Sequence, residues 1–339
     1  EVKYSYGRPV IVKVRDSAYP TGRWVVIVTA GYDNTSGKGV IFFLDAVTGT
    51  EISRVSTGVG SPPGAGQAAG LAQIHAFVKA QSNQVAEQIY GGDLLGNIWR
   101  IDVSGTDQYK SASATLFATV DDGSAPQPIT TAPQIEIDIN NGVDRYVFFG
   151  TGRLLDTSDF TTPTPAQMQT MYAIRDGSLD TPSTTGLPIN ARTFTKPVNA
   201  DLISAIVGGA PNGWHQDLTT PGERIVVDPS AAVNIVAYVG TMVQDDPCII
   251  ALPANLYGRD YTTGESLLTS SGGGPVVASI YEKEGIVGAE IVGKIDPVTK
   301  QQTVGIVTSK EIPGARPVTV VNKFRGIGNR ISWKLLGGQ

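Results

Sequence analysis

A phrase that recurs along the chain narrows its fold more than any other property of the sequence. The phrase consists of an apolar β-branched run, a turn of Gly, Asp or Asn, a second such run and a polar loop. Residues 85–103, VAEQIYGGDLLGNIWRIDV, give one copy. Apolar runs on both sides of a tight turn predict antiparallel hairpins, and their repetition predicts a meander of strands. The other copies are residues 22–52, 134–155 with 171–177, 223–243, and 273–311 leading into 329–336.

The spacing of these copies predicts the fold class. Copies that start roughly 40–80 residues apart are typical of a blade-type repeat decorated by long loops. We therefore predict an all-β fold, a β-propeller or part of one, with about five blades in this chain and long loop insertions. The 339 residues contain 40 Gly, 21 Pro and only 17% charged residues, as expected for a turn-rich protein. We expect residues 1–339 to form a single repeat-built domain.

Charge and hydropathy exclude some partners. The net charge is −5, and lysines and arginines are scattered singly, which argues against a nucleic-acid-binding surface. No run reaches the roughly 18 apolar residues that a membrane-spanning helix needs. The chain opens within the repeated pattern, without a basic and then apolar leader, so we expect it to be a fragment of a longer precursor.

The glycines of YGGDLLGN allow two interpretations, a phosphate-binding loop and a hairpin turn. Phosphate-binding loops follow a strand and open a helix, whereas both sides of this turn predict strands. The hairpin is therefore favoured, and the GTG at residues 150–152 is interpreted in the same way. We expect Tyr90 and Trp99 to pack between blades.

The histidines and the cysteine do not form a recognisable reactive site. His75 lies in GLAQIHAFVKA, whose apolar residues have helical spacing and predict a short helix between blades. His215 lies in a turn-rich loop, and two histidines 140 residues apart supply neither a metal pair nor a catalytic triad. Cys248 is the single cysteine, so an internal disulfide is excluded, and the role of this thiol is left open.

Several segments together resemble a known family. YGGDLLGNIWRIDV, VFFGTGRLL, ERIVVDPS, DDPC and the closing NRISWKLL are similar to the C-terminal propeller domain of the PilY/PilC family. These proteins are the type IV pilus tip-associated adhesins and biogenesis factors. The segments run in family order from about YSYGRPVI to the last strand, so the resemblance covers nearly the whole chain.

The resemblance implies a fold, a location and a role. It implies a modified seven-bladed propeller at the cell surface, associated with the pilus tip or the outer membrane after export through the periplasm. The opening blades and the variable N-terminal adhesive region of the family would lie upstream of Glu1. The implied role is non-enzymatic: it supports pilus extension and adhesion to host or abiotic surfaces, and the propeller is a binding platform for minor pilins.

The resemblance also raises calcium, because several members of the family carry an Asp-rich, EF-hand-like loop just before the YxGD strand. Calcium prefers such loops because it takes 6–8 oxygen ligands. The corresponding run here provides a single carboxylate, and its lysine would repel the ion. We therefore expect a calcium-free replacement at these positions: Lys79, Gln81, Asn83, Val85 and Glu87.

A second stretch, EIDINNGVD, is the predicted calcium loop if a metal is bound anywhere. Its alternate positions are Glu136, Asp138, Asn140, Gly142 and Asp144. The intervening isoleucines also fit a strand with one polar face, and NNG is a common hairpin turn, so a plain hairpin is the favoured interpretation. The expected cofactor is accordingly none, or Ca²⁺ at this loop.

Two other function classes stay open. DAVTG at residues 45–49 occurs in propellers of the pyrroloquinoline-quinone type, which suggests a quinoprotein-like dehydrogenase. That class binds a calcium-held quinone, and its members often carry a vicinal disulfide that one cysteine cannot form. A carbohydrate-binding propeller is the other alternative, with Trp214, Asn212 and Asp217 as its candidate cluster. Fold alone does not choose among these classes.

Overall fold

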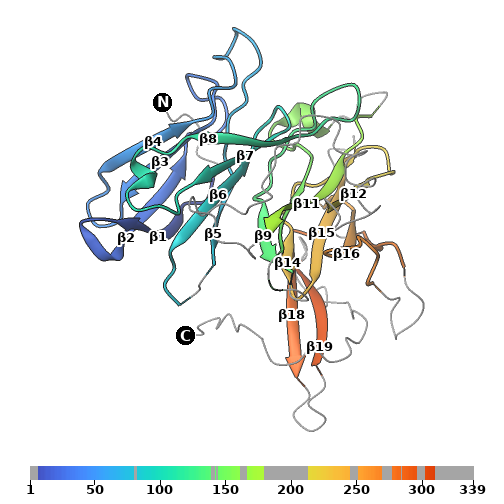
Figure 1. Cartoon of the computed structure of the whole chain (residues 1–339). Helices are drawn as coiled ribbons and strands as arrows, with labels where there is room; N and C mark the ends of the chain where they lie inside the picture. The colour runs from blue at the N-terminus through green and yellow to red at the C-terminus, as the bar shows by residue number, and fades with distance from the viewer. Residues whose placement is uncertain are drawn as a thin grey trace.

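The computed structural model describes residues 7–79, 82–138, 142, 144–160, 166–178, 213–244, 251–268, 277–283, 285–295 and 302–309. Within these residues the chain forms four antiparallel sheets of four or five strands and one hairpin. Each sheet is built from consecutive strands, and Figure 1 shows the sheets in chain order from the blue β1–β4 sheet to the orange β18–β19 hairpin. The predicted all-β propeller architecture is confirmed.

The sheets are called blades 1 to 4 from here on. Blade 1 contains β1 (Val10–Asp16), β2 (Tyr19–Thr29), β3 (Val40–Asp45) and β4 (Glu51–Ser56). Blade 2 contains β5 (Ile74–Val78), β6 (Ala86–Gly92), β7 (Asn97–Asp102) and β8 (Ala114–Thr119). Blade 3 contains β9 (Gln134–Ile137), β10 (Asp144–Gly150), β11 (Thr170–Ser178) and β12 (Gly213–Asp217). Blade 4 contains β13 (Glu223–Arg224), β14 (Ser230–Ala232), β15 (Ile235–Met242), β16 (Ala254–Asp260) and β17 (Ile280–Glu282). The hairpin is β18 (Gly288–Ile295) with β19 (Gln302–Ser309), and two 3-10 turns are η1 (Gln108–Lys110) and η2 (Thr157–Phe160).

The blades are arranged around an axis. The strands β1, β5, β9, β14 and β18 contact one another in succession, so one strand of each blade and one of the hairpin face the centre. Asp228, just before β14, accepts a hydrogen bond from the Ala132 amide at 2.8 Å and pairs with Arg8, just before β1. The segments that lead into blades 1, 3 and 4 therefore meet near the axis.

Hydrophobic cores lie between adjacent blades, because the strands are apolar on both faces. Trp99 belongs to the core between blades 1 and 2, with Leu71 and Phe43. Tyr90 belongs to the core between blades 2 and 3, with Phe149 and Tyr172. The prediction that Tyr90 and Trp99 pack between blades is confirmed, and two further cores join blade 3 to blade 4 and blade 4 to the hairpin.

Each connector between blades also pairs with a loop of the preceding blade. The Gly31 amide donates to Leu71 O at 3.1 Å, the Ile129 amide to Asp93 O at 3.0 Å, and the Ile225 amide to Thr151 O at 2.9 Å. In each pair one residue lies in the loop that follows β2, β6 or β10. The other residue lies in the segment before β5, β9 or β14, the inner strand of the next blade. One end of the propeller is thereby built from connectors and these turns together.

The YGGDLLGNIWRID segment is the β6–β7 turn, as the hairpin interpretation predicts. Asp93 is fully buried there and accepts hydrogen bonds from the Leu95 amide at 2.9 Å, the Asn97 amide at 3.0 Å and the Trp99 indole at 2.8 Å. Burial raises the pKa of Asp93, although these hydrogen bonds oppose the rise. Gly96 closes the turn at a φ of +76°, where a Cβ atom would lie 2.3 Å from Val120 O. The residue types of this segment are therefore explained by the turn.

Aspartates recur at the ends of β3 and β16. Asp45 accepts from the Val47 amide at 3.0 Å and the Thr48 amide at 2.8 Å, and Asp260 accepts from the Thr262 amide at 2.9 Å. DAVTG and DYTTG are thus the same turn in blades 1 and 4, in which the carboxylate binds backbone amides. A structural role explains DAVTG without a cofactor.

The helix predicted over GLAQIHAFVKA is wrong. Residues Ile74–Val78 form β5, which faces the axis, and His75 is half-buried on this strand. A strand that is packed on both faces reads as a nearly continuous apolar run, and over a short segment such a run also matches helical spacing. Within the described residues, the only helical segments are the short 3-10 turns, and none is long and apolar enough to cross a bilayer.

Candidate functional site

A buried cluster of charged side chains joins blades 2 and 3. Asp176 on β11 is fully buried and accepts hydrogen bonds from Arg100 Nη1 at 2.6 Å and Arg145 Nη2 at 3.0 Å. The Tyr90 hydroxyl donates to the same carboxylate, and Arg145 Nη1 donates to Gln88 Oε1 at 2.5 Å. The three strands β6, β7 and β10 thus present their polar groups to one aspartate.

Aromatic rings complete the surroundings of the two guanidinium groups. Arg145 lies 4.9 Å from the centroid of the Phe77 ring, and Arg100 lies 5.7 Å from that of Phe117. Burial and the nearby Asp176 carboxylate raise the pKa of the Tyr90 hydroxyl well above its ordinary value, so this group stays protonated and donates. Removing one member would leave a buried charge without its partner, which makes the cluster a structural link between two blades.

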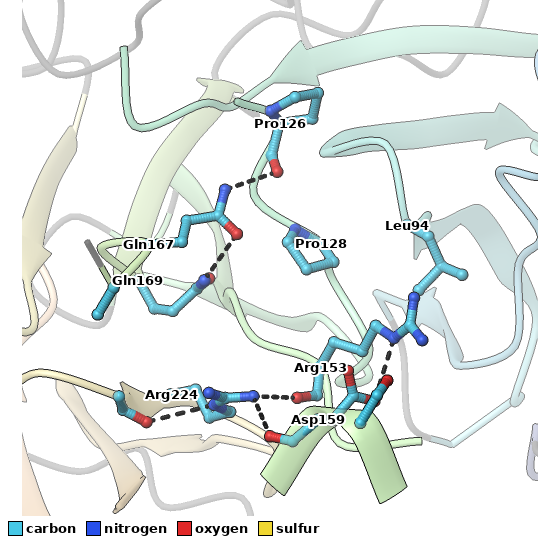
Figure 2. Close-up of a pocket in the computed structure, with 11 residues that line it drawn as sticks. Leu94, Pro126, Pro128, Arg153, Asp159, Gln167, Gln169 and Arg224 are labelled. Carbon is cyan, nitrogen blue, oxygen red and sulfur yellow. Dashed lines mark hydrogen bonds and ion pairs between the residues drawn. The ribbon is translucent and has the colours of Figure 1, made fainter. Parts of the chain in front are cut away.

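A pocket of about 460 Å³ opens where loops of blades 2, 3 and 4 meet. Its walls come from the β6–β7 turn, the connector into blade 3, the β10–β11 loop and the connector into blade 4. Leu94, Pro126 and Pro128 supply apolar surface. Figure 2 shows two glutamines on one side of the pocket, Arg153 on the other side near Leu94, and Arg224 below them. The volume lies in the range of small-molecule sites, ~300–1,000 Å³.

The two glutamines are held in a defined orientation. Gln167 Nε2 donates to Pro126 O at 2.9 Å, and Gln169 Nε2 donates to Gln167 Oε1 at 3.2 Å. Because a backbone carbonyl only accepts, the first bond fixes which end of Gln167 is the nitrogen, and the second then fixes Gln169. Gln169 is only 6% exposed, and its Oε1 has no hydrogen-bond partner among the described residues. The pocket therefore contains a buried, unsatisfied acceptor.

Arg224 is held by carbonyl groups. Its Nε donates to Gly222 O at 3.2 Å, and its Nη1 donates to Arg153 O and Asp159 O, each at 2.9 Å. Within the described part of the chain no carboxylate forms an ion pair with Arg224. Burial lowers the pKa of its guanidinium, and the charge of the nearby Asp159 carboxylate opposes this shift. These three bonds use the Nε and Nη1 groups of Arg224, and Nη2 takes part in none of them.

Arg153, in contrast, is neutralised by acidic neighbours. Its Nε donates to Asp159 Oδ2 at 3.1 Å, and its Nη2 donates to Asp156 Oδ2 at 2.7 Å. The pocket lining thus contains two guanidinium groups and one carboxylate, that of Asp159. Such a lining can bind a polar ligand, and an anionic group is favoured beside Arg224.

The predicted calcium loop is the β9–β10 hairpin. Glu136 lies opposite Tyr146 in the ladder, Asp138 is buried, and the Gly142 amide donates to Asp138 O at 2.7 Å. Asn140 lies outside the described residues, and for Asp144 only the backbone at the start of β10 is described. Among the described residues no three His, Cys, Asp or Glu side chains gather as metal ligands, but this leaves the loop itself untested.

The degenerate loop connects β5 to β6 and docks on blade 1. The Lys13 amide donates to Gln84 O at 2.9 Å, and the Val85 amide donates to Asn83 Oδ1 at 3.0 Å. Glu87 lies 3.7 Å from Arg15 Nη2. Lys79 is exposed, and Gln81 lies outside the described residues. The one carboxylate of this loop therefore faces a cation of the neighbouring blade.

The remaining candidate residues have packing roles where they are described. Trp214 is 7% exposed, its indole donates to Tyr261 O at 2.8 Å, and its ring packs in the core between blades 3 and 4. Asp217 accepts from Thr170 Oγ1 at 2.8 Å. His215 lies beside the Tyr172 ring, and burial lowers its pKa. Asn212 and Cys248 lie outside the described residues.

Four-stranded meanders set around an axis, with hydrophobic cores between them, define a β-propeller. The model of the PilY1 beta-propeller domain matches residues 1–192, and the chain belongs to this family. The resemblance to the PilY/PilC proteins is thereby confirmed.

Curated relatives and a solved structure agree with this assignment. The type IV pilus biogenesis factor PilY1 of Pseudomonas aeruginosa PAO1 is 25% identical over 318 residues, which cover 79% of this chain and 26% of PilY1. A PilY1 homolog of Xylella fastidiosa is 26% identical over 253 residues, covering 66% of this chain and 16% of that protein. The chain therefore spans about a quarter or less of these relatives.

The fold itself matches a solved domain. The crystal structure of the Pseudomonas aeruginosa PilY1 C-terminal domain superposes with a TM-score of 0.68 at 20% identity, covering 95% of this chain and 72% of that chain. At this identity the match shows a shared fold.

The residues of the buried cluster and of the pocket were missed at the level of sequence. Arg100 and Arg145 carry a signal, because each is a charge directly beside apolar residues of a strand, in NIWRID and DRYVFFG. Gln167, Gln169, Arg153 and Arg224 carry none, because polar residues in loops and at strand ends are ordinary and only the fold brings these four together.

Proposed function

We propose that this chain is the propeller of a type IV pilus biogenesis factor and that it acts without catalysis, as a rigid platform for minor pilins at the pilus tip. Membership of the PilY1 propeller family carries this proposal. The names of the curated relatives, type IV pilus biogenesis factors, support the same role. The proposed location is the cell surface, and the loops would contribute to adhesion to host or abiotic surfaces.

The geometry is suited to a platform. Cores between successive blades and the buried cluster at Asp176 fix the sheets relative to one another. Loops at the two ends of such a scaffold can vary without disturbing the sheets. A rigid scaffold also lowers the entropic cost of binding a partner.

A deletion in the native host tests the proposal. Removing residues 1–339 from the full-length protein should abolish surface pili while the cellular level of the major pilin stays normal. Electron microscopy would count pili, and immunoblots would measure pilin and the truncated protein, so that loss of the whole protein is recognised. Unchanged piliation with a stable truncated protein would contradict the proposal.

A calcium site at residues 136–144 is a second part of the proposal. Glu136 and Asp138 supply carboxylates next to the β9–β10 turn, and Asp144 follows that turn. If the loop binds Ca²⁺, a chelator should lower the melting temperature by several degrees, because a ligand bound only to the folded state stabilises it. Asp144→Ala should remove this difference, whereas Glu87→Ala in the degenerate loop should leave it intact. A melting curve that the chelator does not move would exclude the site.

A further inference from the structure

The pocket at the junction of blades 2, 3 and 4 has binding groups that the proposed platform role does not use. Its lining includes Gln169, whose Oε1 is buried without a hydrogen-bond partner among the described residues, the carbonyl-held Arg224, and the apolar side chains of Leu94, Pro126 and Pro128. These groups come from four separate segments that lie within about 130 residues of one another in the chain, at a place where small ligands commonly bind between repeats.

We propose that this pocket binds a hydroxylated carboxylate, specifically an acidic sugar residue of the hexuronic acid class. The proposal stands apart from the role in pilus assembly, since it concerns what this end of the propeller recognises.

The environments of the two arginines indicate that the ligand carries a carboxylate. Arg153 is already paired with Asp156 and Asp159, whereas the bonds of Arg224 all end on neutral carbonyls. Three bonds hold the Arg224 guanidinium in place, so its Nη2 group is fixed in position before a ligand arrives. A cation held in this way, without a carboxylate partner among the described residues, favours an anion.

The unpaired oxygen of Gln169 indicates that the ligand also carries a hydroxyl group. The chain of bonds from Pro126 O through Gln167 shows that the unpaired atom of Gln169 is the oxygen, so the ligand must bring a donor. A simple dicarboxylate is fully ionised at neutral pH and has no hydrogen to donate, and a phosphate monoester is mostly in its dianionic form, with few donors. A uronic acid carries hydroxyl donors on the same ring as its carboxylate, and its C–H face can lie against proline rings.

A peptide fits the pocket less well. An extended peptide would need free backbone groups to pair with, and the backbone here is already bonded: Pro128 O accepts from the Gly152 amide at 2.7 Å, and the Ile129 amide donates to Asp93 O at 3.0 Å. Pro126 and Pro128 have no N–H to offer. The unmet groups are side chains that converge from different loops, which suits a compact ligand with several hydroxyls.

Ligand-observed NMR and calorimetry with small probes test the proposal. Methyl β-D-glucuronide should bind with a Kd on the order of 1 mM, a normal affinity for a single sugar residue. Methyl β-D-glucoside, which lacks only the carboxylate, and cyclohexanecarboxylate, which lacks the hydroxyls, should each bind about tenfold more weakly or not at all. N-acetylaspartate amide serves as the acidic peptide probe and should not compete.

Variants locate the binding. Gln169→Leu removes the acceptor at similar volume, and Arg224→Gln removes the charge; each should weaken glucuronide binding about tenfold. Arg54→Gln, on β4 and outside the pocket, should bind as the original chain does. Because Arg224 also holds three carbonyls, melting curves must accompany its variant, and Gln169→Leu decides the outcome if Arg224→Gln does not fold. Absence of glucuronide binding, equal binding of the glucoside, stronger binding of the aspartate probe, or unchanged binding by Gln169→Leu would each overturn the proposal.

Discussion

One aspartate position has two different uses in this protein. Asp45, Asp102 and Asp260 end β3, β7 and β16 and accept hydrogen bonds from backbone amides of the turns that follow, and Asp45 also pairs with Arg23. Asp176 occupies the corresponding place in blade 3, but its carboxylate bonds Arg100 and Arg145 instead. The sequence predicts the turns after Asp45 and Asp260, since both follow the local pattern D-x-x-T-G. It does not predict the buried use, because Arg100 is 76 residues away from Asp176 and only the packing of two blades joins them.

The two uses predict different costs for the same substitution. Asp176→Asn would keep the shape of the side chain but leave Arg100 and Arg145 buried without their carboxylate, at a cost of ~3–5 kcal/mol in the free energy of unfolding. Asp260→Asn is the matched control, because asparagine can also bind turn amides, and it should cost less than ~1 kcal/mol. Urea or guanidinium unfolding of the two variants measures the difference. Equal losses would show that the buried cluster contributes no more to the free energy of unfolding than a single turn does.

At the scale of strands and turns, the central hairpins were predictable and the strands beside them were less so. β6–β7 and β2–β3 have two β-rich runs around a turn of Gly, Asp and Asn, a strong local signal. β5 was mistaken for a helix, because a short strand that is packed on both faces lacks alternation. The predicted hairpin over residues 134–150 is confirmed as β9–β10. A calcium ion at its turn stays a prediction.

The β6–β7 turn offers a test of close backbone approach. Gly96 and Gly49 both have positive φ, +76° and +72°, but a Cβ at Gly96 would lie 2.3 Å from Val120 O, whereas a Cβ at Gly49 would meet nothing within 4 Å. Alanine at either position costs ~1–2 kcal/mol for the left-handed backbone. Gly96→Ala should lose a further ~1–3 kcal/mol, because the Val120 strand end must move. Thermal or chemical unfolding of both variants measures this gap, and its absence would mean that the turn relaxes freely.

For the molecule as a whole, the repeats in the sequence predict the order of the blades. They do not predict the contacts between segments that meet near the axis. Asp228 joins Arg8 and Ala132, which lie 220 and 96 residues away in the chain. Nothing local to VVDPS in the sequence indicates these partners. The pocket is invisible in the sequence for the same reason, since its walls are assembled only when blades 2, 3 and 4 stand side by side.

The two bonds of Asp228 should differ in value. Asp228→Ala would leave the Ala132 amide unpaired, at a cost of ~1–3 kcal/mol. Arg8→Ala should cost less than ~1 kcal/mol, because the Arg8 side chain is 71% exposed and ion pairs in water are weak. Chemical unfolding of the two single variants would separate these contributions. A larger loss from Arg8→Ala would mean that the ion pair is the main link across the axis.

The β3–β4 turn lies at the opposite end of the propeller from the connectors, because β3 runs from one end to the other. Val47 in that turn is 92% exposed. A biotin or dye attached there would anchor the protein to a sensor chip with its connector end free, so that glycans or pilins in the flowing solution meet the pocket side first.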